Sequence, residues 1–134
     1  MKASGGKFFE RDGVAIGGYD PVAYFTAGEA VKGSPDVTAE YGGSSFHFAS
    51  EANRDAFSAD PGRYAPQYGG FCAFGTARGY KAKIDPSAFT IVEGRLYLNY
   101  NVDVQARWRG DVQGHIAKAD ANWPEVSQRT EVHE

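Results

Sequence analysis

The stretch FHFASEANRDAFSADPGRYAPQYGGFCAFG, residues 46–75, carries most of the fold information in this chain. It begins as a strand in which Phe46 and Phe48 face one way and His47 faces the other, because side chains alternate along a strand. Ser50 is a suitable N-cap for the helix that follows, and a proline-containing turn comes next. The stretch therefore predicts a strand, a helix and a turn that lead through two glycines to Cys72, the one cysteine of the chain.

Two hairpins are predicted around this stretch. The first pairs residues 37–41 with 44–49 across Gly42-Gly43, a dipeptide suited to a two-residue primed turn. The second pairs residues 89–92 with 95–100 across Glu93-Gly94. Helical segments lie between and after them, so the predicted fold is α+β: one small domain in which two β-hairpins form an antiparallel sheet with short helices packed on it.

Composition excludes several classes of function. The chain has 134 residues, a net charge of −3 and no cluster of basic residues, which argues against nucleic-acid binding. No apolar run approaches the roughly 20 residues that a membrane-spanning helix needs. The first 13 residues lack the apolar core of a signal peptide, so we expect either a mature exported protein whose leader has been removed or, alternatively, a cytoplasmic protein.

Three interpretations of Cys72 are open: a buried apolar filler, a metal ligand or a reactive thiol. Free cysteines are among the most buried residues, which favours the first. The glycines before Cys72 allow close backbone approach and place it near a predicted helix N-terminus. Such a position favours the thiolate, so we predict a pKa below that of a free thiol.

Four further polar or aromatic residues are candidates for a site. His47 lies on the strand face opposite the two phenylalanines, either exposed or lining a site behind the hairpin. Asn53 and Asn99 are amides among apolar neighbours; they satisfy buried backbone groups or, if they converge on Cys72, line a ligand pocket. Tyr24 belongs to a set of tyrosines that forms either an aromatic core or the wall of that pocket.

The segments GYDPVAYF, residues 46–75, IVEGRLYLNYN and IAKADANWP together resemble the YHS-domain proteins, and more narrowly their small, usually exported bacterial branch. The resemblance covers residues 9–126 and implies a YHS-like domain there, with a flexible N-terminal segment at 1–8 and a polar C-terminal tail at 127–134. It also implies a periplasmic location.

The resemblance implies metal handling, of copper in the first place, but not through the usual thiols. The positions that match the metal-ligand cysteines of the family are occupied by Ala23, Ala49 and, approximately, Asn53. The narrow branch is similar to this chain in carrying its thiol at the position of Cys72. A copper site would then use Cys72, His47 and a weaker donor, with help from a carboxylate or from a second chain in a homodimer.

Two functions follow. We expect a non-enzymatic module that binds a metal ion, copper in the first place, or a small molecule around Cys72. The alternative is a small thiol-dependent enzyme or redox protein in which the Cys72 thiolate is the nucleophile.

Overall fold

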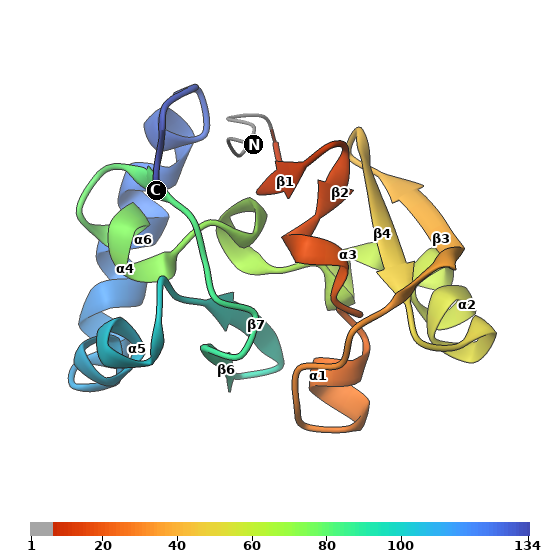
Figure 1. The fold of residues 1–134 in the computed structure, drawn as a ribbon. Coiled ribbons are helices and arrows are strands. Elements are labelled where there is room, and N and C mark those ends of the chain that lie inside the picture. Colours follow the sequence, from red (N-terminus) through yellow and green to blue (C-terminus); the bar gives the residue numbers. More distant parts are fainter. Residues whose placement is uncertain (1–6) are drawn as a thin grey trace.

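The computed structural model describes residues 7–134, and these contain both helices and strands, as expected for an α+β fold. In chain order the elements are β1 (Glu10–Arg11), β2 (Val14–Ala15), η1 (Ile16–Gly18), α1 (Ala23–Thr26), β3 (Ser34–Tyr41), β4 (Ser44–Phe48), α2 (Glu51–Ala59), α3 (Pro61–Tyr64), η2 (Gln67–Gly70), α4 (Ala73–Ala77), β5 (Lys81–Ala82), β6 (Phe89–Val92), β7 (Arg95–Leu98), α5 (Val102–Arg109), α6 (Val112–Val126) and β8 (Val132–His133). Figure 1 shows β1–β4 with α1–α3 on one side of the molecule and α4–α6 with β6 and β7 on the other.

The strands form several small sheets. One has the order β1-β2-β4-β3, with β2 parallel to β4 and β3 antiparallel to β4. The pairs β6–β7 and β5–β8 are separate two-stranded sheets, antiparallel and parallel respectively. The prediction that both hairpins share one antiparallel sheet is therefore wrong. The η2 segment packs beside β7, and β6–β7 stays a sheet of its own.

The turns of the two antiparallel pairs lie where the sequence predicts them. Gly42 and Gly43 have φ values of 61° and 86°, the conformation that a primed two-residue turn requires. Glu93 and Gly94 adopt the same left-handed region, with φ values of 50° and 75°. The pairing therefore runs directly outward from each turn, with Tyr41 opposite Ser44 in the first pair.

An aromatic cluster fills the space between β4 and α2. Phe46, Phe48 and Phe57 are at most 1 % exposed, and the Phe57 ring centroid lies 5.0 Å from that of Phe46 and 5.3 Å from that of Phe48. Residues of β4 alternate between buried and half-buried, as the sequence predicts, so His47 lies on the opposite face. This packing fixes α2 against the first sheet (Figure 1).

The two sides of the molecule are joined through aromatic contacts. Phe9 packs edge-on against Phe71, with 6.0 Å between ring centroids, and Tyr24 contacts Phe89 at 4.8 Å. The hydroxyl of Tyr24 also donates a hydrogen bond to the carbonyl oxygen of Pro86 at 2.7 Å. These contacts connect the N-terminal elements to the segment before α4, to the loop before β6 and to β6 itself.

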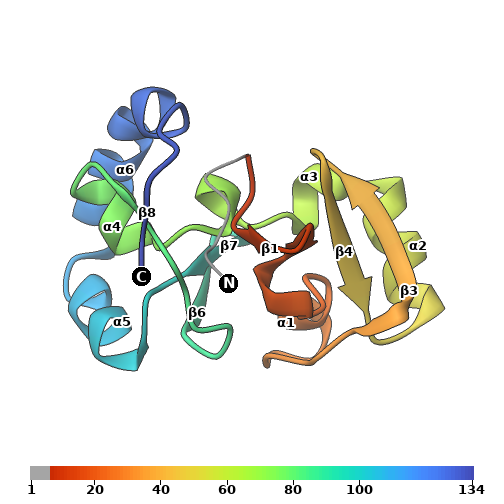
Figure 2. The same ribbon diagram turned by 45° about the horizontal axis from the view of Figure 1, so that its top comes forward.

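Both ends of the described chain pack against the body. Of the expected N-terminal segment, residues 1–6 lie outside the described residues, while Phe8 is 4 % exposed and contacts Phe46. The polar tail, residues 127–134, ends in β8, which runs beside β5 (Figure 2). Among the helices of residues 7–134, none combines the length and the apolar character needed to cross a membrane.

Candidate functional site

Cys72 follows a sharply bent segment that only small residues allow. Gly69 and Gly70 have positive φ values, and a Cβ on Gly70 would lie 2.7 Å from Cγ2 of Ile16. The chain then turns so that Cys72 immediately precedes α4 and its N–H donates to the carbonyl of Ala82 at 3.0 Å. The glycine pair therefore brings Cys72 beside β5.

The thiol of Cys72 is buried but has polar neighbours. Cys72 is 2 % exposed. Its Sγ donates to Oδ1 of Asn99 at 3.5 Å and accepts from the N–H of Gly75 at 3.5 Å. Burial raises the pKa of the Cys72 thiol, and this effect exceeds the opposite effect of the N–H groups of Gly75, Tyr100 and Phe74. The prediction of a lowered pKa is wrong, because α4 has only five residues and the sulfur lies out of water.

Asn99 is held directly beside this thiol. It follows β7, and its main chain makes two hydrogen bonds with the loop before β6. The N–H of Asn99 donates to the carbonyl oxygen of Ala88 at 2.9 Å, and the carbonyl oxygen of Asn99 accepts from the N–H of Asp85 at 3.0 Å. Oδ1 of Asn99 also accepts from the N–H of Phe74 at 3.1 Å, so one amide oxygen serves both the thiol and the start of α4. Its Nδ2 is buried and has no hydrogen-bond partner within residues 7–134.

A cavity of about 260 Å³ opens beside Cys72. Its wall combines aromatic and aliphatic side chains with two that carry or can carry positive charge. The lining residues are Cys72, Phe74, Gly75, Tyr80, Ala82, Tyr100, Val104, Arg107 and His133. This mixture of an apolar wall and a few polar groups is typical of a small-molecule site.

The other three candidates from the sequence lie away from this cavity. Asn53 donates from Nδ2 to Oδ2 of Asp20 at 2.8 Å, in the first half of the chain. Tyr24 is bonded to the Pro86 carbonyl, and His47 lies against Gly18, whose Cβ, if present, would be 3.2 Å from Nδ1 of the imidazole. Of the five candidates, the structure brings together Cys72 and Asn99.

Of the nine wall residues, eight were not singled out by the sequence, among them Arg107, Tyr80 and His133. Arg107 lies on α5, one helical turn after Val104, so the two side chains share a face of the helix. The apolar pattern that predicts Val104 to face the protein interior was therefore the available signal for the position of Arg107. Tyr80 and His133 meet with 4.4 Å between ring centroids because β8 pairs with β5. Nothing in the local sequence indicates this long-range pairing.

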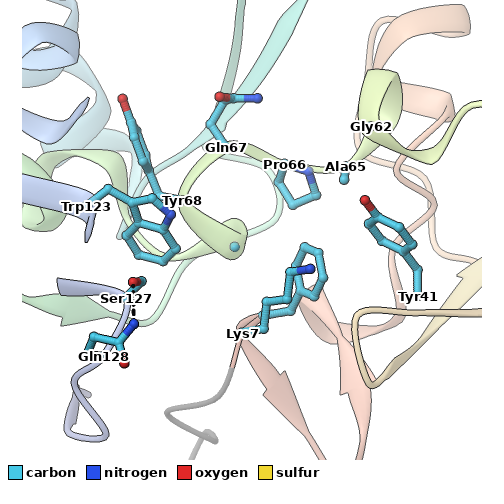
Figure 3. A pocket seen from close by; sticks show the side chains of 12 residues that line it. Lys7, Tyr41, Gly62, Ala65, Pro66, Gln67, Tyr68, Trp123, Ser127 and Gln128 are labelled. Carbon is cyan, nitrogen blue, oxygen red and sulfur yellow. Dashed lines mark hydrogen bonds between the residues drawn. The ribbon is translucent and has the colours of Figure 1, made fainter. Parts of the chain in front are cut away.

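A larger hollow lies elsewhere on the molecule. It measures about 630 Å³ and lies between α6, the β3–β4 end and the chain before Cys72 (Figure 3). In it Tyr68 and Trp123 meet edge-on at 5.9 Å, and the Tyr68 hydroxyl donates to Asp120 at 2.8 Å. This hollow contains none of the five residues that the sequence singled out, so the Cys72 cavity is the candidate site.

A copper ion at Cys72 would find few donors from this chain. Within residues 7–134 there is no group of three or more His, Cys, Asp or Glu side chains arranged to hold a metal ion. Cys72 and His133 share the cavity, while His47 is not part of its wall. A metal ion there would need ligands beyond these two side chains.

Comparison with known proteins supports the YHS resemblance for the first half of the fold. The family model described as the YHS domain matches residues 22–68, about a third of the chain. The matched segment runs from α1 to η2 and contains Tyr24, His47 and Asn53, but it ends four residues before Cys72. Searches of curated proteins and of solved structures found no significant match. The exported bacterial branch, the periplasmic location and the homodimer stay predictions.

Proposed function

We propose that this chain is a non-enzymatic binding module and that its ligand, a small molecule, enters the cavity at Cys72. The observation that carries the proposal is the cavity itself, about 260 Å³ with a thiol, two tyrosines and an arginine in its wall. A dry apolar cavity of about 150 Å³ is already large enough to hold benzene. A ligand somewhat larger than a single ring therefore fits in the space available.

The state of the thiol favours binding over catalysis. Because burial raises the pKa of Cys72, the sulfur is a neutral thiol near neutral pH. A nucleophilic cysteine instead needs a lowered pKa, usually from a neighbouring base or cation. The alternative of a thiol-dependent enzyme is therefore the weaker one.

Copper is the second candidate ligand, because Cys72 and His133 line the same cavity and YHS domains are associated with metal handling. Thiolate and imidazole are ligands that copper accepts. Two such donors form an incomplete set, so we expect a third from a second chain or from a small molecule. This candidate replaces His47 of the sequence-based proposal with His133.

The test fills the cavity with a larger side chain introduced on α5. Val104 lines the cavity, whereas Val102 on the same helix is 58 % exposed and does not. We expect benzamide, followed by ligand-detected NMR, to bind the unmodified protein and the Val102→Trp control but not Val104→Trp. Equal binding by Val104→Trp, or no binding to any of the three proteins, would contradict the proposal. In parallel, one equivalent of Cu(I) retained by the unmodified protein and lost in both Cys72→Ser and His133→Asn would favour copper.

A further inference from the structure

Two arginines lie against the ring of Phe74, a wall residue of the Cys72 cavity. Cζ of Arg107 lies 5.0 Å from the centroid of the Phe74 ring, and Cζ of Arg78 lies 5.3 Å from the same centroid. The His115 ring is 5.2 Å from Phe74. Since Phe74 is itself a wall residue of the cavity, the two guanidinium groups lie on the ring that borders the ligand space.

These two arginines have no acidic partner within residues 7–134. The ion pairs of the described chain join other groups: Arg11 to Glu134, Arg54 to Glu51 and Asp55, Arg129 to Glu125, and His133 to Glu131. Asp103 precedes Arg107 by one helical turn, yet the two do not come within the 4.0 Å of an ion pair. Neither guanidinium group is therefore neutralised by an ion pair within residues 7–134.

A lysine lies beside another residue of the cavity wall. Nζ of Lys83 is 5.4 Å from the ring centroid of Tyr100, which also lines the cavity. The cavity thus has an aromatic and aliphatic interior, formed by Phe74, Tyr100 and Val104 among others, and the guanidinium-bearing Arg107 in its wall. An arginine without a carboxylate partner is well suited to an oxyanion, because its planar fork can donate two parallel hydrogen bonds.

We propose that the ligand of the Cys72 cavity is a small aromatic oxyanion, whose ring enters the cavity and whose charged group is bound by Arg107 with help from Arg78. This inference rests on the function proposed above and adds the chemical class of the ligand. A carboxylate and a phosphate monoester share this chemistry. The proposed ligand has one ring and one anionic group at its edge.

Three probes of similar size separate charge from shape. Benzoate carries the anionic group, benzamide is its neutral isostere, and benzylamine carries the opposite charge. Their dissociation constants are measured by NMR titration with the unmodified protein and with Arg107→Gln and Arg78→Gln. Arg63→Gln is the matched control, because Arg63 is an exposed arginine 5.3 Å from the ring centroid of Tyr64 that lines no cavity described above.

We expect benzoate to bind at least about tenfold more tightly than benzamide, with benzylamine weakest, because a charge-assisted hydrogen bond contributes more than a neutral one. Arg107→Gln removes this preference and leaves benzamide binding unchanged, Arg78→Gln reduces it, and Arg63→Gln preserves it. The preference also falls as salt is raised. Phenyl phosphate is the fourth probe: binding tighter than that of benzoate assigns the anion as phosphate, and weaker binding assigns it as carboxylate.

The inference is overturned if benzoate binds no more tightly than benzamide, or if Arg63→Gln loses as much benzoate affinity as Arg107→Gln. The proposed function fails in a different way, with no probe bound by the unmodified protein or with all probes bound equally by Val104→Trp. The two failures are therefore distinguishable in one set of titrations.

Discussion

Asn53 donates a hydrogen bond from Nδ2 to Oδ2 of Asp20 at 2.8 Å, linking the start of α2 to the loop before α1. Asp20 is fully buried, and its other oxygen accepts from the N–H groups of Val22 and Ala23 at 2.8 Å and 3.2 Å. The N–H of Ala49 also donates to Oδ2 at 2.8 Å. One carboxylate therefore joins α1, the end of β4 and α2.

Replacing Asp20 should destabilise the fold strongly. Asp20→Ala leaves buried donors without an acceptor, and each such loss costs about 1–3 kcal/mol. We expect the free energy of unfolding, measured by urea denaturation, to fall by about 3 kcal/mol. Asn53→Ala should lower it by about 1 kcal/mol, and the exposed Asp55→Ala by less than about 0.5 kcal/mol. If the Asp20 and Asn53 losses simply add in the double mutant, the two side chains are not coupled.

Local features of the fold could be predicted from the sequence because local chemistry decides them. Both turns lie at the predicted dipeptides, and Ser50 caps α2 as predicted. Asn101 caps α5 in the same way, through its side-chain oxygen. The carboxylate of Asp20 accepts from the N–H groups of Val22 and Ala23 at the start of α1. The hydrogen bond between Asp20 and Asn53 joins residues 33 positions apart, and neither the local sequence pattern nor the helix period predicts this long-range contact.

The candidate site was predictable only in part for the same reason. The position of Cys72 at the start of a helix was predicted from the glycine pair and is confirmed. Of the two alternatives for Asn99, the one beside Cys72 is the one observed. The burial of the sulfur could not be predicted, because it depends on how α4, β5 and β8 pack together. The parallel pairing of β5 with β8 joins segments about 50 residues apart, so no turn signal specifies it.

The thiol of Cys72 should react slowly with alkylating reagents at neutral pH. Burial raises its pKa, so the midpoint of iodoacetamide reactivity against pH should lie above the value of about 8.5 for a free thiol. The urea-unfolded protein provides the control and should show the ordinary midpoint. A folded-state midpoint below that of the unfolded chain would contradict the burial argument.

The same raised pKa gives a direction for stability. Below about pH 8.5 the thiol is protonated in both states and contributes no pH dependence. Above that value the unfolded chain releases the proton while the folded thiol retains it, so the unfolded state is favoured. The free energy of unfolding of the unmodified protein should therefore fall relative to that of Cys72→Ala between about pH 8 and 10. A difference that is constant over this range would show that the folded thiol ionises normally.

Lys81 should stabilise the C-terminal region although it is a buried lysine. Its Nζ donates to the carbonyl oxygens of Ser127 at 3.2 Å and Arg129 at 2.8 Å, just after α6, and lies 4.7 Å from the ring centroid of Phe71. Lys81→Met keeps the apolar stem but removes the donor, and we expect a loss of about 2 kcal/mol in urea denaturation. Lys118→Met, at an exposed position of α6, should change the stability by less than about 0.5 kcal/mol. Equal effects of both substitutions would mean that the ammonium group of Lys81 contributes nothing.

Strand β8 should control access to Cys72, because it forms one wall of the cavity. The carbonyl of His133 accepts from the N–H of Lys83 at 2.9 Å, and the hydroxyl of Tyr100 donates to the carbonyl of Glu134. Deleting residues 131–134 removes these bonds and the His133 ring. We expect the alkylation rate of Cys72 at pH 8 to rise about tenfold, which corresponds to an opening free energy lower by about 1.4 kcal/mol.

The substitution His133→Ala separates the ring from the backbone pairing. It retains the bond from Lys83 and removes only the side chain that contacts Tyr80, so the alkylation rate should lie between those of the unmodified and the truncated protein. The free energy of unfolding, measured on all three proteins, shows whether a faster rate reflects local opening or global unfolding, because only global unfolding scales with total stability. If the truncated protein reacts at the unmodified rate, the reagent reaches Cys72 by a route that β8 does not cover.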